Sequence, residues 1–151
     1  MMVWRRCMSV VVLVAATCVG TTAQSKQPAG PETATVTGRV VDAACYMLHP
    51  PAATSTSHKE CGAACLARGV PLAIATDEGA LYFPADGNQR LKTLLNARVR
   101  VTGTVVQKNE PMELKMPVGD ANNMVVRLEG GYRQITIQTL TPLKPAKRTT
   151  P

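Results

Sequence analysis

The chain has 151 residues, a formal net charge of +7 at pH 7 and only 3% aromatic residues. Most of the excess positive charge lies near the two ends, because residues 32–141 hold 11 basic and 10 acidic side chains. A nearly neutral central region with few aromatic rings disfavours nucleic-acid binding, which needs a basic groove and stacking platforms. This length also favours one domain over several.

The first 23 residues have the order of residue types that is typical of a signal peptide. Arg5 and Arg6 precede the apolar run VVVLVAATCVG, and small residues follow at Thr21 and Ala23. This order predicts cleavage after Ala23 and a periplasmic or secreted protein. The apolar run is too short to span a bilayer, so we expect no membrane span in the mature chain. Lipid attachment at Cys18 is the alternative, but the residues before it lack the large aliphatic side chain of such a signal.

Two segments rich in proline and polar residues flank the expected domain. Residues 24–34 are expected to form a flexible leader and residues 142–151 a basic, disordered tail, because such compositions bury too little apolar surface to fold. Residues 35–141 are expected to form a single domain.

Two similar segments within this domain are predicted to be strands. The segments VTGRVV at 36–41 and VTGTVV at 101–106 are rich in β-branched residues. Gly38 and Gly103 stand where a strand bends or allows another backbone to come close. The match is too short for a tandem repeat, so we interpret it as one structural requirement met twice.

A helix is predicted over residues 58–68, between these two strands. Ser57 and Glu60 have the spacing of a capping box, and Gly69 is a suitable C-terminal stop. The chain between Cys45 and this helix is rich in Pro, Ala, Thr and Ser and is expected to be a loop.

The remaining segments predict short strands and a second short helix. Residues 71–84 read as two short strands joined by a turn, and residues 87–97 as a short helix. Short strands are expected at 112–116 and 124–128, and a final strand at 132–140. This order predicts a mainly β fold with one or two short helices. The nearest common architecture is a small antiparallel barrel like the oligonucleotide-binding (OB) fold, with a helical insert after the first strand.

Four side chains that bind metals are expected to meet around the helix. At about 100° per residue, His58, Cys61 and Cys65 fall within an arc of about 60° on one helix face. Cys45 follows the first strand and is tethered close enough to join them. Three cysteines and one histidine form an accepted ligand set for zinc and a plausible one for Cu(I).

Other interpretations of these cysteines stay open. An exported protein tends to oxidise its cysteines, so a disulfide from Cys45 to Cys61 or Cys65 is an alternative that leaves one thiol over. Asp42 is expected to cap the turn after the first strand or to orient a ligand. His49 is expected to be a solvated loop residue.

Met112 and Met116 would share one face of a strand. Gap-filling core packing is the commoner role of methionine, and thioether ligation of copper is the alternative.

Several of these segments together resemble a group of small exported bacterial proteins. The segments are GRVVDAACYMLHP, SHKECGAACLARGVPLAI, LYFP and ARVRVTGTV, and the resemblance covers about residues 35–140. It implies a barrel-like domain and supports treating Cys45, His58, Cys61 and Cys65 as one unit. The Cys61-x-x-x-Cys65 spacing is also similar to that of the Sco copper-delivery proteins and of the dinuclear copper loop of cytochrome oxidase subunit II. Only the spacing is shared, because the thioredoxin pattern and the downstream His and Met are absent.

These features predict an exported module that binds zinc or copper, in a structural or metal-handling role. The alternative is a disulfide-stabilised periplasmic barrel with a spare thiol, acting in thiol redox chemistry or in binding a ligand or a partner. No Gly-x-Ser-x-Gly elbow, Walker loop, His-Glu-x-x-His helix or haem-attachment motif occurs in the sequence. We therefore expect no enzymatic activity.

Overall fold

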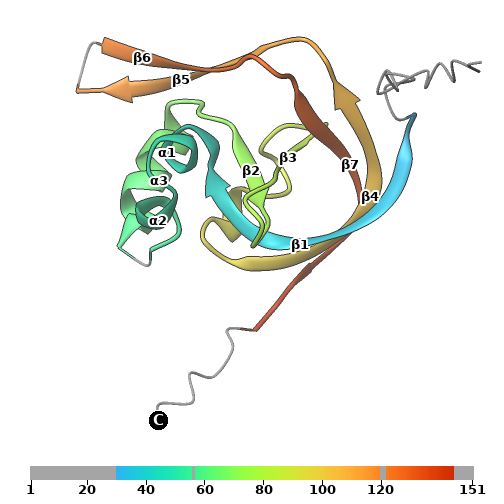
Figure 1. Ribbon diagram of the computed structural model, residues 1–151. Coiled ribbons are helices and arrows are strands. Elements are labelled where there is room, and N and C mark those ends of the chain that lie inside the picture. Colours follow the sequence, from blue (N-terminus) through green and yellow to red (C-terminus); the bar gives the residue numbers. More distant parts are fainter. Residues whose placement is uncertain (1–29, 56, 120–121, 145–151) are drawn as a thin grey trace, which may run out of the picture.

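The computed structural model describes residues 30–55, 57–119 and 122–144 (Figure 1). The predicted signal peptide, residues 24–29 of the predicted leader and residues 145–151 of the predicted tail lie outside these ranges. The strands are β1 (Glu32–Asp42), β2 (Leu72–Ala75), β3 (Leu81–Pro84), β4 (Arg98–Lys108), β5 (Met112–Val118), β6 (Asn122–Leu128) and β7 (Tyr132–Pro142). The helices are α1 (Ala43–Leu48), α2 (Pro50–Ala53), α3 (His58–Ala67) and the 3-10 turn η1 (Lys92–Leu94).

Five of these strands close into a barrel in the order β1-β2-β3-β7-β4. The first strand closes it, because Arg39–Asp42 pairs with β2 while Glu32–Arg39 pairs with β4. All neighbours are antiparallel except β3 and β7, which are parallel. The predicted small, mainly β barrel with a helical insert after the first strand is confirmed, and its single parallel pair makes the sheet mixed.

Gly38 and Gly103 lie where two backbones approach closely. A Cβ atom on Gly38 would overlap the carbonyl oxygen of Ala75 in β2, and one on Gly103 would overlap that of Thr136 in β7. The β4–β7 register also shifts between Thr102 and Gly103. The two similar segments therefore meet the same requirement, as predicted, because a strand that coils around a narrow barrel needs such points.

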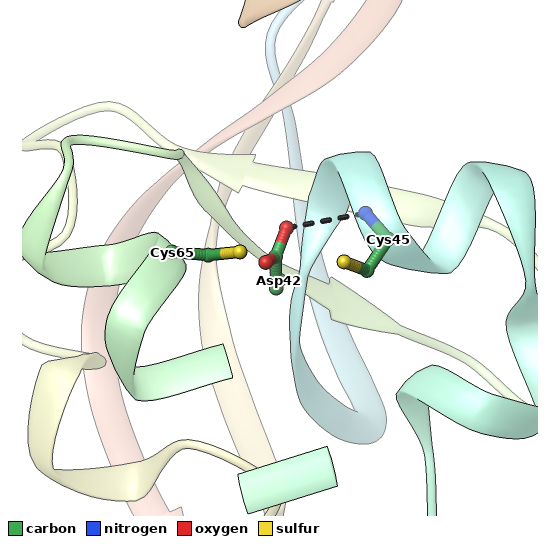
Figure 2. Close-up of side chains that lie close together, drawn as sticks. All are labelled: Asp42, Cys45 and Cys65. Carbon is green, nitrogen blue, oxygen red and sulfur yellow. Dashed lines mark hydrogen bonds between the residues drawn. The ribbon is translucent and has the colours of Figure 1, made fainter. Parts of the chain in front are cut away.

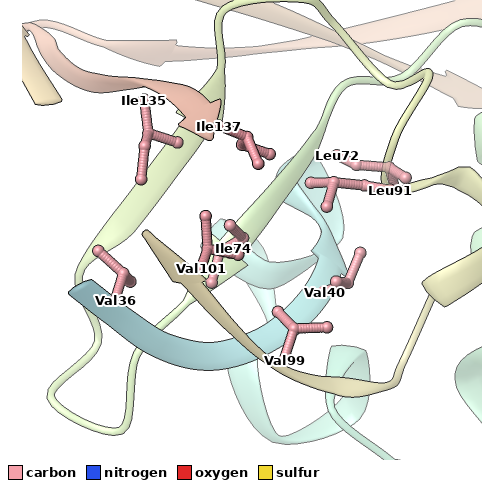
Figure 3. Packing of buried hydrophobic residues seen from close by; sticks show 9 residues of the cluster. All are labelled: Val36, Val40, Leu72, Ile74, Leu91, Val99, Val101, Ile135 and Ile137. Atoms are coloured by element: carbon pink, nitrogen blue, oxygen red, sulfur yellow. The ribbon is translucent and has the colours of Figure 1, made fainter. Parts of the chain in front are cut away.

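The barrel interior is filled by aliphatic side chains from alternate strand positions (Figure 3). The buried members of this cluster are Val36, Val40, Leu72, Ile74, Leu91, Val99, Val101, Ile135 and Ile137. Burying a side chain of this kind stabilises the fold by about 1.5–3 kcal/mol. This cluster holds the barrel closed.

A second buried cluster lies outside the barrel and positions the candidate site. It contains Ala43, Ala44, Cys65, Val70, Ala73, Phe83 and Leu114, contributed by the helices, the barrel and the β5–β6 hairpin. Strand β2 joins the two clusters, because Leu72 and Ile74 face the barrel interior while Ala73 faces the helices. In Figure 1 the hairpin extends across the helices, and α1 packs against β5.

The helical insert differs in detail from the prediction. The expected loop after Cys45 begins instead with helices α1 and α2. Helix α3 forms where predicted, but Ser57 makes no side-chain capping bond, so the predicted capping box is wrong. The second predicted helix is reduced to η1.

The barrel strands extend beyond the predicted domain. β1 starts at Glu32, inside the predicted leader, and β7 ends at Pro142, the first residue of the predicted tail. Within the described ranges, no helix is long and apolar enough to cross a membrane.

Candidate metal centre

Asp42 ends β1 and starts α1 from a fully buried position. Its relative exposure is 0%, and it is the buried charged residue of the described core. Its Oδ1 atom accepts hydrogen bonds from the backbone N–H groups of Ala44 and Cys45, at 3.1 and 3.2 Å. The carboxylate is thus the N-cap of α1. The predicted capping role of Asp42 is confirmed, and it fixes the place of Cys45 in the first turn.

Cys65 comes to the same place from α3. Gly62 and Cys65 are the buried residues of this helix, which packs against β1 and α2. One carboxylate oxygen of Asp42 and the Sγ atoms of Cys45 and Cys65 all lie within 4.8 Å of one another. Figure 2 shows the carboxylate between the two thiols. We call Asp42, Cys45 and Cys65 the thiol–carboxylate cluster.

The second oxygen of Asp42 lacks an expected partner. Oδ2 is buried and has no hydrogen-bond partner among the described residues. A buried carboxylate oxygen without a partner is costly, and such an atom in a folded protein usually faces a proton donor or an ion. In the cluster this oxygen therefore faces either the thiol protons of Cys45 and Cys65 or a cation that replaces them.

Both thiols of the cluster resist ionisation in the metal-free protein. Burial raises the pKa of Cys45 from 9.0 to about 11, and the negative charge of Asp42 acts in the same direction. Burial also raises the pKa of Cys65, again with Asp42 acting in the same direction. Near neutral pH the metal-free cluster therefore holds two protonated thiols, and a metal that binds as a thiolate complex must displace both protons.

The separations in the cluster suit a single metal ion. In a tetrahedral site a zinc ion lies about 2.3 Å from each thiolate sulfur, which places two sulfurs about 3.8 Å apart. Distances within 4.8 Å reach that spacing after shifts of about 1 Å or less. A disulfide requires a larger approach, because its sulfurs are about 2.05 Å apart. Cys45, Cys61 and Cys65 are free thiols in the structure.

The predicted Cys3His set is brought together only in part. Cys45 and Cys65 meet, whereas His58 and Cys61 do not belong to the cluster, and Asp42 takes a place in it. Cys61 is exposed although it lies one helical turn from Cys65. Residues that share a helix face point in similar directions, but they need not be buried to the same extent. In α3 the buried face contains Gly62 and Cys65 rather than Cys61.

The two histidines are placed differently from each other. The Nε2 atom of His58 is buried without a hydrogen-bond partner among the described residues, and its ring lies beside Gly62. His49 is exposed at the end of α1, in keeping with the predicted solvated position.

Met116 of β5 was expected to fill a gap in the core. It packs against the second buried cluster, and its Sδ atom lies 3.7 Å from the Sγ atom of Cys45. No local pattern in the sequence pairs these two residues, which are 71 positions apart.

Comparisons with protein families, with curated proteins and with solved structures gave no match for this chain. The geometry of the site itself therefore defines its class, which is a buried carboxylate beside one buried thiol, Cys65, and one half-buried thiol, Cys45.

Proposed function

We propose that this protein binds one zinc or copper ion through the thiol–carboxylate cluster. The observation that carries the proposal is the mutual distance, within 4.8 Å, of two thiols and a buried carboxylate oxygen. Thiolate sulfur and carboxylate oxygen are both accepted zinc ligands, and thiolate sulfur also binds Cu(I). We propose a structural or metal-handling role for this ion.

A bound cation, unlike a disulfide, would give the buried Asp42 oxygen a positive partner in place of the thiol protons. Oxidation of Cys45 and Cys65 would remove both thiol protons and leave Oδ2 facing two sulfurs without a donor. A metal ion supplies positive charge at the same place. It also links β1, α1 and α3, so binding would stabilise the helical insert.

A thiol redox pair is the second candidate function. The two sulfurs lie close enough for a modest rearrangement to bring them into bonding distance.

Export, predicted from the first 23 residues, would place the pair where disulfides form. We include export in the proposal, and N-terminal sequencing of the exported protein, with Gln24 expected first, tests it separately.

Metal titration of three cysteine variants tests the proposed function. Cys45→Ser and Cys65→Ser each remove a ligand and should weaken Zn(II) binding to the reduced protein by at least about tenfold. Cys61→Ser is the matched control, because this exposed residue belongs to the same helix but not to the cluster. Unchanged Zn(II) and Cu(I) affinity in both cluster variants would reject the proposal.

A further inference from the structure

We propose that the cluster is selective for Cu(I), with Met116 as its third sulfur ligand. This inference rests on the proposed function and goes beyond it by naming the metal and a further ligand. Its basis is the 3.7 Å distance between Met116 Sδ and Cys45 Sγ. Cys45 Sγ therefore has two sulfur neighbours, Met116 Sδ at 3.7 Å and Cys65 Sγ within 4.8 Å.

The separation of the two sulfurs matches that of ligands around one ion. Sulfur ligands about 2.3 Å from a metal lie about 3.8 Å apart in tetrahedral geometry and slightly farther apart in trigonal geometry. Cys45 and Met116 already have this spacing, and Cys65 completes a set of three sulfurs. Cys45 is the sulfur common to both contacts, so a bound ion would lie beside this residue.

The donor types favour Cu(I) over Zn(II). Thioether sulfur is a soft ligand that selects Cu(I), whereas zinc sites in proteins use thiolate, imidazole and carboxylate ligands. Binding of Cu(I) to the two thiols releases two protons and leaves two thiolates, one cation and a neutral thioether. The Asp42 carboxylate then lies beside the cation and keeps its hydrogen bonds to α1.

Met116 lies outside the barrel, at a position from which it could add a third ligand to the site. It belongs to the β5–β6 hairpin, which forms a separate two-stranded sheet and packs against α1. Leu114 of the same strand is fully buried in the second cluster and anchors the hairpin there. Met116 itself is only partly buried, so the site remains near the surface where a metal can be exchanged.

Selenomethionine labelling provides a direct test. The reduced protein is labelled, loaded with Cu(I) under anaerobic conditions and studied by X-ray absorption, which distinguishes copper–selenium from copper–sulfur contacts. Met116→Leu keeps the side-chain volume and removes the thioether. Met112→Leu is the matched control, because Met112 lies on the same strand and packs against the same cluster.

We expect a copper–selenium contact in the wild type and in Met112→Leu, and its loss in Met116→Leu. Competition with a Cu(I) chelator should show at least about tenfold weaker binding in Met116→Leu, while Zn(II) affinity stays unchanged. Retention of the selenium contact, or an equal loss of Cu(I) and Zn(II) affinity, would overturn the inference. If Cys65→Ser also leaves both affinities unchanged, the proposed function itself fails.

Discussion

The backbone N–H of Cys45 donates a 3.2 Å hydrogen bond to Oδ1 of Asp42. A single carboxylate therefore starts helix α1 and borders the thiol that this helix carries. The first oxygen serves the helix, and the second faces the cluster (Figure 2). These two roles are separable by substitution, because asparagine caps a helix about as well as aspartate but carries no charge.

Asp42→Asn and Asp42→Ala should therefore differ in stability but agree in metal binding. Alanine removes the N-cap and should lower the free energy of unfolding by about 1–2 kcal/mol, whereas asparagine keeps the cap and should lower it less. Both variants lose the charge beside the thiols and should bind Cu(I) or Zn(II) at least about tenfold more weakly. Urea denaturation and metal titration measure the two effects. Wild-type metal affinity in Asp42→Asn would show that the charge plays no part.

The raised thiol pKa values predict alkaline destabilisation of the reduced, metal-free protein. The folded state holds the Cys45 proton more tightly than the unfolded state, because its pKa is about 11 rather than 9.0. This contribution to stability is fully present below pH 9.0 and is lost as the pH rises toward about 11. The raised pKa of Cys65 acts in the same sense.

Denaturation curves between pH 8 and pH 11 check this prediction. The double variant Cys45→Ala/Cys65→Ala is the control, because it lacks the two cluster thiols and keeps every other side chain of the wild type. The wild type should lose more stability than the double variant over this range. Parallel curves for the two proteins would contradict the prediction.

Gly103→Ala should strongly destabilise the barrel. The added Cβ would overlap the carbonyl oxygen of Thr136, so β4 and β7 must move apart at their register shift. We expect a loss of at least about 2 kcal/mol in the free energy of unfolding. Gly130→Ala is the control, because a Cβ there meets no atom within 4 Å, and its effect should stay within about 0.5 kcal/mol. Equal stability of the two variants would argue against the close approach.

Local patterns were sufficient to predict much of the barrel. The β-branched content of 36–41 and 101–106 identified β1 and β4, and the turn residues between β2 and β3 separated those strands. Helices α1 and α2 were not predicted, because the chain from Ala43 to Ala53 is short and proline-rich. Helix α1 depends on the Asp42 cap and on packing against the barrel and β5, which are tertiary features.

The candidate site was predicted only in part, because its geometry also depends on tertiary contacts. Spacing along α3 correctly placed Cys65 on the inward face, but it could not tell the buried Cys65 from the exposed Cys61. The position of Asp42 after the first strand suggested a cap or a residue that orients a ligand, yet only the fold shows that it is fully buried beside both thiols. The contact between Met116 and Cys45 depends on how the hairpin folds across α1, which no local pattern encodes.

Metal content and free thiols, measured on one sample purified without chelator, test the central claim most directly. Elemental analysis should find about one zinc or copper ion per chain, as expected for a single site. Thiol titration after denaturation should find Cys45, Cys61 and Cys65 all reduced, in agreement with their state in the structure. A metal-free protein with Cys45 joined to Cys65 and one remaining thiol would contradict the account and support the disulfide alternative instead.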